Sequence, residues 1–195
     1  MEILPIELFI NSVRKDWPST GAAPRVLEIG GKEDTAAYMR VHGLAVDEID
    51  FARHGLTYEE TPLKPGKYDG IYISHTLEHV RNVGIMLDRF AIDLRIGGML
   101  AILVPPAKHD IVGGHLTLWN PGLLLYNLVV AGFDCRDAAV ATVGYNVIVV
   151  TRHIRRPEVK LTHDHGDIEK LAPFFPMPVK QGFDGRMDLL NWSTR

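Results

Sequence analysis

Short apolar runs and helix-spaced apolar residues alternate along most of this chain. Mainly apolar runs predict strands at residues 25–29, 44–49, 70–73 and 99–104, and the run at 99–104 is continuous, as in strands buried on both faces. Apolar residues at helical spacing predict amphipathic helices at residues 5–16, 35–41, 83–94 and 121–131. Strands that alternate with helices favour right-handed crossovers, and therefore a mostly parallel sheet.

Residues at the ends of these runs predict where the helices begin and end. Pro5 suits the first turn of the first helix, and Trp17-Pro18 ends it. Asp34 is predicted to cap the second helix and Gly43 to end it. Gly97-Gly98 is predicted to close the helix at residues 83–94.

The sequence predicts an abbreviated third unit and a closing hairpin. Between Asp50 and Tyr68 we expect loop, with at most a short strand near residues 56–59. The apolar runs at 133–142 and 145–151 are separated by two residues, which is too few for a crossover helix. These runs must therefore pair antiparallel, as a hairpin.

The predicted fold class is α/β: a Rossmann-like, mostly parallel sheet with flanking helices and a terminal antiparallel hairpin. Residues 1–153 form this domain, including the N-terminal helix. Residues 154–195 are rich in proline and charge and lack periodicity, so they are interpreted as a tail outside the main sheet. We expect this tail to cover a substrate or to serve in oligomerisation.

A turn with two glycines follows the first predicted strand. Glu28-Ile29-Gly30-Gly31 ends that strand, and glycine lets a backbone approach a bound ligand closely. Lys32, Glu33 and Asp34 come next, so neither the G-x-G-x-x-G of dinucleotide sites nor the G-x-x-x-x-G-K-[ST] of phosphate loops is present. We expect a ligand that is not held by its phosphates.

The composition excludes some classes of function. The chain has 195 residues, 46% hydrophobic and 23% charged, which is enough for one buried core, and its net charge of -3 argues against nucleic-acid binding. No apolar run approaches the ~20 residues that span a membrane. Cys135 is the only cysteine, interpreted as a small buried residue, and Glu2 and Glu7 interrupt the apolar start. We therefore expect a cytoplasmic protein without disulfides or a signal peptide.

Four stretches of the sequence match one enzyme family. They are the first strand with its glycines, the acid after the second strand, the strand and turn that follow, and the next helix and strand: residues 26–30, Asp50, residues 68–80 and residues 94–106. The third stretch contains Ser74-His75-Thr76-Leu77-Glu78-His79. These residues resemble the class I methyltransferases that use S-adenosylmethionine, of the small-molecule type with an S-x-x-L-E-H turn.

The resemblance implies S-adenosylmethionine as cofactor and assigns residues to its binding: Glu28, Gly30, Gly31, Asp50, Ser74 and His75. Asp50 can accept hydrogen bonds from both ribose hydroxyls, each worth about 1.5 to 3 kcal/mol when well made. Glu28 is expected to face the cationic methionine end of the cofactor. The family usually has glycines where this chain has Lys32 and Asp34, so its first motif is degenerate here.

Methyl transfer requires little from side chains, because the sulfonium is already activated and the reaction depends on positioning and desolvation. A hydroxyl acceptor needs a base, and His115, in the loop after the strand at 99–104, is the first candidate. His79 is the second, with the alternative role of holding its turn by hydrogen bonds. His163-Asp164-His165 is interpreted as part of a solvated tail, and no metal site is assigned.

Two functions of different class follow. The first is S-adenosylmethionine-dependent methyl transfer to a small-molecule or glycan-linked acceptor, at oxygen. The alternative is a methyltransferase-like protein without activity that serves as a binding or partner module. For the first, residues 107–119 and the aromatic residues of the tail are expected to complete an acceptor pocket, in one chain or across a homodimer: Phe174, Phe175, Phe183 and Trp192.

Overall fold

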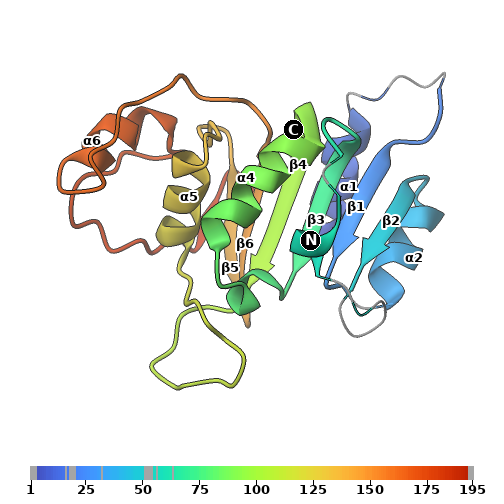
Figure 1. The fold of residues 1–195 in the computed structure, drawn as a ribbon, viewed down its shortest axis with the longest axis horizontal. Helices are drawn as coiled ribbons and strands as arrows, with labels where there is room; N and C mark the ends of the chain where they lie inside the picture. The colour runs from blue at the N-terminus through green and yellow to red at the C-terminus, as the bar shows by residue number, and fades with distance from the viewer. Residues whose placement is uncertain are drawn as a thin grey trace.

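The computed structural model of the protein describes residues 4–15, 17, 21–31, 33–50, 55, 57–62 and 64–192. In this part of the chain a seven-stranded sheet has the order β2-β1-β3-β4-β6-β5-β7 (Figure 1). The strands are β1 (Arg25–Ile29), β2 (Ala45–Ile49), β3 (Tyr68–Ser74), β4 (Leu94–Val104), β5 (Ala139–Val143), β6 (Asn146–Arg152) and β7 (Leu189–Leu190). The helices are α1 (Pro5–Lys15), α2 (Glu33–Val41), α4 (Val83–Asp93), α5 (Pro121–Val130) and α6 (Asp167–Leu171), with 3-10 turns η1 (Tyr58–Glu60), η2 (Leu77–His79) and η3 (Ala172–Phe174).

Strand directions confirm the predicted fold class. β1 pairs in parallel with β2 on one side and with β3 on the other, and β3 pairs in parallel with β4. β6 then pairs antiparallel with β4 and with β5, as the two-residue connection between the hairpin strands requires. The chain changes direction across the sheet between β1 and β3. Ligands of open α/β sheets bind beside such a point, at the carboxyl ends of the strands.

Helices cover both faces of the sheet (Figure 1). On one face α1 and α2 pack against the strands, and α1 buries Phe9 and Ile10 of its predicted apolar stripe. On the other face α4 and α5 contribute most of the helical side chains to the larger core. Gly70 of β3 allows α1 to lie close to the sheet, because a Cβ there would be 2.7 Å from Phe9 Cζ. Pro18, the predicted end of the first helix, lies outside the described residues.

Two predicted helix boundaries are wrong. α4 ends at Asp93, and β4 begins at Leu94 and runs through Gly97-Gly98. Gly98 has a packing role in this strand, since a Cβ there would lie 2.8 Å from Leu94 Cδ1 and 3.0 Å from the Asp69 carbonyl oxygen. α2 begins at Glu33, so Asp34 lies in its first turn instead of capping it.

Between β2 and β3 the described residues form a 3-10 turn and coil, and none of them is in a strand. The predicted loop is therefore confirmed for the described residues: residues 57–59 are in no strand, and Leu56 lies outside the described residues. Tyr58 of η1 is buried, and its hydroxyl donates a hydrogen bond to Asp93 Oδ2 at 2.8 Å. This hydrogen bond holds the turn in place. It joins residues far apart in the sequence, so no local pattern of apolar residues predicts it.

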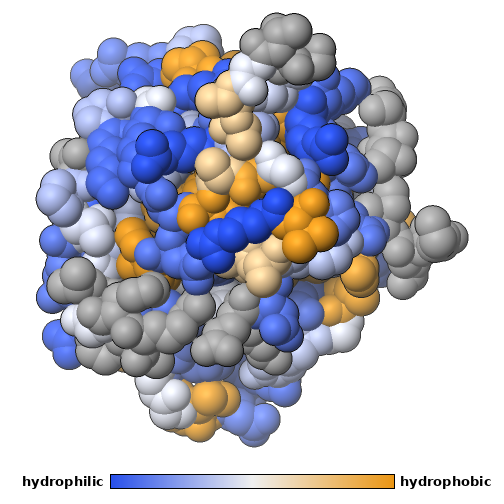
Figure 2. Space-filling model, turned by 90° about the vertical axis from the view of Figure 1, so that its right-hand side faces the viewer, coloured by the Kyte–Doolittle hydropathy of each residue, from blue (hydrophilic) through white to orange (hydrophobic). Residues whose placement is uncertain are grey.

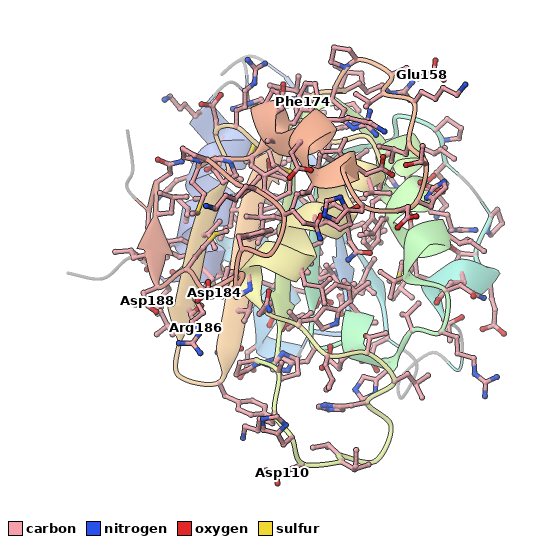
Figure 3. The ribbon with its side chains drawn as sticks, turned by 90° about the vertical axis from the view of Figure 1, so that its left-hand side faces the viewer. Asp110, Glu158, Phe174, Asp184, Arg186 and Asp188 are labelled. Carbon is pink, nitrogen blue, oxygen red and sulfur yellow. The ribbon has the colours of Figure 1, made fainter. Side chains whose placement is uncertain are left out.

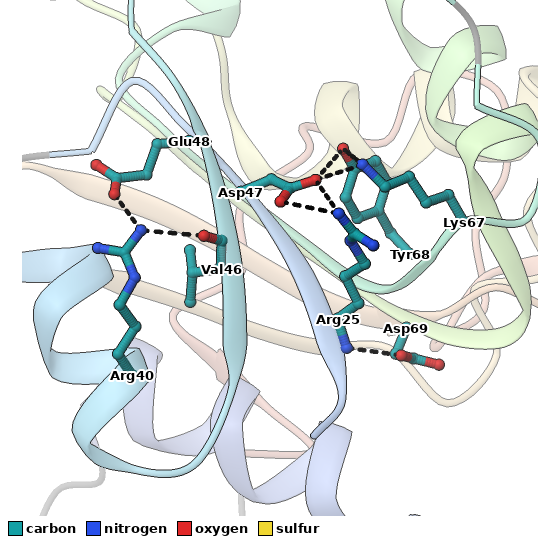
Figure 4. Close-up of polar contacts among 8 residues, drawn as sticks. All are labelled: Arg25, Arg40, Val46, Asp47, Glu48, Lys67, Tyr68 and Asp69. Carbon is teal, nitrogen blue, oxygen red and sulfur yellow. Dashed lines mark hydrogen bonds and ion pairs between the residues drawn. The ribbon is translucent and has the colours of Figure 1, made fainter. Parts of the chain in front are cut away.

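β2 forms one edge of the sheet in the described part of the chain. Asp47 of this strand accepts hydrogen bonds from Arg25 at 3.3 Å, from the Tyr68 hydroxyl at 3.0 Å and from Lys67 (Figure 4). Figure 2 shows hydrophobic residues gathered at the centre of this side of the molecule, with hydrophilic residues around them. The charged side chains of Asp47 and its partners limit pairing of this edge strand with other chains.

The tail forms part of the main fold, and the expectation that it lies outside the sheet is wrong. β7 pairs antiparallel with β5, and Leu171, Phe175 and Met187 are buried in the larger core. Figure 3 shows the segment with Asp184 and Arg186 running beside the β5–β6 hairpin. A two-residue strand is too short to produce a period in the sequence, which explains why the pattern did not reveal it.

The helices of the described residues include none that combines the length and the apolar character needed to cross a membrane.

Candidate functional site

Three parallel strands end together at the carboxyl edge of the sheet. Ile29 of β1 is in register with Ile49 of β2 and with Ile73 of β3. The Gly30 N–H donates a hydrogen bond to the Ile49 carbonyl at 3.0 Å, which fixes the exit of β1 beside the exit of β2. Gly30 and Asp50, which follow their strands, and Ser74, the last residue of β3, therefore lie together at this edge, as their predicted shared role requires.

Gly30 is enclosed by the turn that follows β3. Its φ is +72°, and a Cβ at this position would be 1.8 Å from Thr76 Oγ1 and 2.8 Å from the Ser74 carbonyl oxygen. The Thr76 hydroxyl donates a hydrogen bond to the Ser74 carbonyl at 3.1 Å. Glycine at position 30 thus permits contact between the turns after β1 and β3, in a backbone conformation that L side chains rarely adopt.

Glu28 lies behind this edge. Its side chain is fully buried, and its Oε1 would be 1.6 Å from a Cβ placed on Gly31. Burial raises the pKa of the Tyr72 hydroxyl, and the negative charge of Glu28 raises it further. The carboxylate therefore packs beneath the Gly31 backbone, and its expected role toward the methionine end of a cofactor stays a prediction.

Asp50 directly follows β2 and is partly exposed. A partly exposed acid at the tip of β2, beside a turn whose two glycines carry no side chain of their own, fits the ribose and backbone contacts of a nucleoside cofactor. Of the two residues that make the glycine motif degenerate, Asp34 is exposed on α2 and Lys32 lies outside the described residues.

The turn after β3 directs its histidines away from Gly30. His75 has a φ of 48°, sparsely populated by residues other than glycine, and its N–H donates to the Leu103 carbonyl at 2.9 Å. Its Nε2 lies 2.9 Å from Asn146 Oδ1, at the start of β6. The His75 ring therefore lies toward β6, and the expected role of Ser74 and His75 in cofactor binding stays a prediction.

The two predicted base candidates lie next to each other. The rings of His79 and His115 meet edge to face, with their centroids 5.1 Å apart. The loop that carries His115 is held against η2, because the Leu116 and Thr117 N–H groups both donate to the Glu78 carbonyl, at 2.7 and 3.2 Å. The Glu78 side chain also joins the two histidines, and the sequence reasoning missed it although it stands beside His79 in the turn.

The expected acceptor aromatics do not meet in one pocket. Phe183 lines a cavity of about 550 Å³ between the start of α5 and the tail, together with Tyr126 and His163. Phe175 is buried in the larger core, where its ring contacts Phe183, and Trp192 packs against the cluster beneath α1. The loop at residues 107–119 projects from the carboxyl end of β4, with Asp110 at its far end (Figure 3).

The fold of this chain recurs in solved structures, although neither a protein-family model nor a curated protein matches its sequence. A 1,6-didemethyltoxoflavin-N1-methyltransferase from Burkholderia thailandensis, crystallised with 1,6-didemethyltoxoflavin and S-adenosylhomocysteine, is 18% identical with a TM-score of 0.59, over 76% of this chain and 78% of its own. The DszA carbon methyltransferase is 15% identical with a TM-score of 0.59, over 77% of this chain and 53% of its own. The CurJ carbon methyltransferase is 13% identical with a TM-score of 0.56, over 78% of this chain and 56% of its own. The chain therefore has the fold of the class I S-adenosylmethionine-dependent methyltransferases.

Proposed function

We propose that this protein binds S-adenosylmethionine and transfers its methyl group to a hydroxyl oxygen of a small-molecule or glycan-linked acceptor. One observation carries the proposal. Asp50, Gly30 and the turn from Ser74 to Thr76 come together at the carboxyl edge of the sheet, beside the point where the strand order reverses. Open α/β sheets bind nucleoside ligands at this place.

The residues at this edge of the sheet have separate tasks in binding. The Asp50 carboxylate accepts hydrogen bonds from the ribose hydroxyls, and such charge-assisted bonds are each worth about 1.5 to 3 kcal/mol. The backbone after β3, at Ser74 and His75, borders the part of the ligand that crosses from β1 toward β4. Glu28 acts from beneath the Gly31 backbone, where its negative charge favours a cationic group above it.

When bound, the cofactor supplies an activated methyl group on a sulfonium. The chain has to hold the acceptor oxygen in line with that methyl group, exclude water and accept the hydroxyl proton. His115 is the proposed base, because its partly exposed ring lies in the loop after β4 and imidazole titrates near neutral pH. The likeness to a structure that holds S-adenosylhomocysteine and a small molecule supports this function.

Calorimetric titration with S-adenosylmethionine and with S-adenosylhomocysteine tests cofactor binding. We expect binding at one site, weakened about tenfold or more in Asp50→Ala, because that substitution removes at least one charge-assisted hydrogen bond. Asp88→Ala is the matched control, since Asp88 is an exposed acid on α4, and it should bind as the wild type does. Incubation of the protein with labelled cofactor and a cell extract, followed by identification of the labelled product, then identifies the acceptor.

The degenerate first motif favours a second function, in which the fold serves as a binding or partner module without methyl transfer. Lys32 and Asp34 replace glycines of the family pattern. Absence of both heat and thermal shift with either ligand at millimolar concentration favours this second function. One-site binding that Asp50→Ala weakens, together with a methylated product, favours the enzyme.

A further inference from the structure

Three side chains in the turn after β3 and the loop after β4 form a cluster of acid and imidazole groups. Glu78 in η2, its neighbour His79 and His115 in the loop after β4 each offer one ligand atom, and these atoms all lie within 4.8 Å of one another. We propose that this cluster binds one divalent first-row transition-metal ion of the Zn²⁺ type. The proposal goes beyond the methyl transfer proposed above and does not depend on it, and in the metal-bound protein His115 is a ligand and no longer the base.

The Glu78 carboxylate is buried and lacks a full set of partners. The side chain is 1% exposed, and its Oε1 lies 3.5 Å from His75 Nδ1 and 3.8 Å from His79 Nε2. Its Oε2 receives no hydrogen bond from any residue in the described part of the chain. Buried charges in proteins are paired or bind metals, and a cation at the cluster supplies the partner that Glu78 needs.

A hydrogen bond at Nδ1, on the side of the ring away from Glu78, orients His79 as a metal ligand. Its Nδ1 lies 2.8 Å from the Gly114 carbonyl oxygen, which can only accept, so Nδ1 carries the proton. In the neutral ring the lone pair of Nε2 then faces the Glu78 carboxylate, and these two repel each other unless a positive charge lies between them. Metal-binding histidines commonly donate their other N–H to a carbonyl or carboxylate in this way.

His75 shows the same arrangement on the other side of Glu78. Its Nε2 donates to Asn146 Oδ1 at 2.9 Å, so in the neutral ring Nδ1 has its lone pair toward Glu78 Oε1. Two imidazole nitrogens of lone-pair type thus flank one buried carboxylate. This concentration of electron pairs favours a cation at the cluster, either a metal ion or protons on the imidazoles, and the titrations with zinc distinguish the two.

The backbone holds the third ligand in place. The Leu116 and Thr117 N–H groups donate to the Glu78 carbonyl, which positions the neighbouring His115 over η2. Gly114 has a φ of +83°, and a Cβ there would be 3.2 Å from His79 Nδ1, so glycine allows this part of the loop to approach the ring. The loop is closed at its base by the Ala107 N–H, which donates to the Trp119 carbonyl at 2.6 Å.

The donor set selects the class of metal. Two imidazoles and one carboxylate suit Zn²⁺ and related ions, whereas Mg²⁺ and Ca²⁺ prefer oxygen ligands. Ligand atoms of tetrahedral zinc, at ~2.0–2.2 Å from the metal, lie about 3.3 Å apart. The ligand atoms of the cluster lie within 4.8 Å of one another, so metal binding requires them to move closer together. Three protein ligands leave a fourth position open to water or a further ligand.

Calorimetric titration of the metal-stripped protein with zinc sulfate, without S-adenosylmethionine, tests the proposal. We expect one site, weakened about tenfold or more in His79→Ala and in His115→Ala, and no competition from millimolar Mg²⁺. His109→Ala is the matched control, because His109 is exposed in the same loop. His163→Ala is a second control, for a histidine that also stands beside an acid but lies outside the proposed site. Because both proposed imidazoles reach the surface, these variants keep the fold, which circular dichroism verifies.

Thermal unfolding gives a second readout. Zinc should raise the melting temperature of the wild type and of His109→Ala, and should raise it much less in His79→Ala and His115→Ala. Absence of zinc binding to the wild type would overturn the proposal. Binding that both His79→Ala and His115→Ala leave unchanged would overturn it too, because the ion would then lie elsewhere.

Discussion

The Glu28 carboxylate occupies the space that a side chain on Gly31 would need. A Cβ at position 31 would lie 1.6 Å from Glu28 Oε1 and 2.6 Å from Glu28 Cδ. Glu28 is fully buried at the end of β1, and a Cβ on residue 31 would also be 3.2 Å from Thr35 Cβ on α2. The connection from β1 to α2 is therefore packed around a carboxylate, and glycine at position 31 serves the turn itself.

Gly31→Ala should destabilise the protein, because the new methyl group forces the buried carboxylate and the turn apart. Overpacking of this kind typically lowers the free energy of unfolding by about 1–3 kcal/mol. Denaturant titration measures the change. Gly84→Ala is the matched control: Gly84 lies in α4, and a Cβ there would meet no described atom within 4 Å. Alanine at position 84 should therefore stabilise the helix by about 0.5–1 kcal/mol.

A double-mutant cycle identifies the cause of the Gly31→Ala effect. In a Glu28→Ala background the space that the carboxylate fills next to residue 31 is open. Gly31→Ala should therefore lower the free energy of unfolding by much less. The same loss of stability in both backgrounds would show that the carboxylate is not what the methyl group meets.

Asp47 should make stability depend on pH in the acid range. Burial alone would raise its pKa, but hydrogen bonds from Lys67, Arg25 and Tyr68 lower the pKa from 3.8 to about 2. The folded state thus favours the charged carboxylate, and the resulting stability is present above about pH 4 and lost as pH falls toward 2. For a side chain that is 32% exposed we expect about 1–2 kcal/mol at pH 7.

The measurement compares the wild type with Asp47→Asn from pH 7 to pH 2. The difference in free energy of unfolding should shrink below about pH 4. Asp110→Asn, at the exposed end of the loop after β4 (Figure 3), should show no such pH-dependent difference. A difference between wild type and Asp47→Asn that stays constant with pH would contradict the assignment of this titration to Asp47.

Cys135 should be unreactive in the folded protein. Its side chain is fully buried, and burial raises the pKa of its thiol to about 12. At pH 8 the thiolate, which is the reacting form, is then only about one part in ten thousand. Because it is the only cysteine, an aromatic disulfide reagent should release one equivalent of chromophore quickly in denaturant and slowly in buffer. Rapid release in buffer would contradict the burial of this residue.

The elements that the sequence predicted well are those with long apolar runs or short connections. β1 has the predicted bounds, and the two residues between β5 and β6 required the antiparallel pairing that the structure shows. The start of β4 was wrong because Leu94 carries both a helical and a strand signal, and the choice depends on Gly98 packing against Asp69 across the sheet. β7 has two residues and depends on pairing with β5, so no local pattern could indicate it.

The residues of the candidate site also divide into those that the sequence could predict and those that it could not. Gly30, Asp50 and Ser74 each stand at the carboxyl end of a parallel strand, and strand register alone places them together. Thr76 and Glu78 were missed because their roles come from contacts between the turn after β3 and other segments. Thr76 fills the space beside Gly30, and the Glu78 carbonyl holds the loop after β4. The position of Glu78 between His75 and His79 was the available signal.

Phe175→Ala tests whether residues 154–195 belong to the main core. Phe175 is 5% exposed, packs with the larger core, and meets Phe183 edge to face with centroids 6.1 Å apart. Removing a buried phenyl ring should lower the free energy of unfolding by about 3–5 kcal/mol. Leu189→Ala is the control from the same segment, because Leu189 is 64% exposed and its truncation should change stability by at most about 0.5 kcal/mol.

A separate tail that only covers a substrate would lose turnover in Phe175→Ala while keeping its unfolding midpoint. A cooperative transition shifted to lower denaturant in Phe175→Ala alone would instead mean that the segment folds together with the sheet.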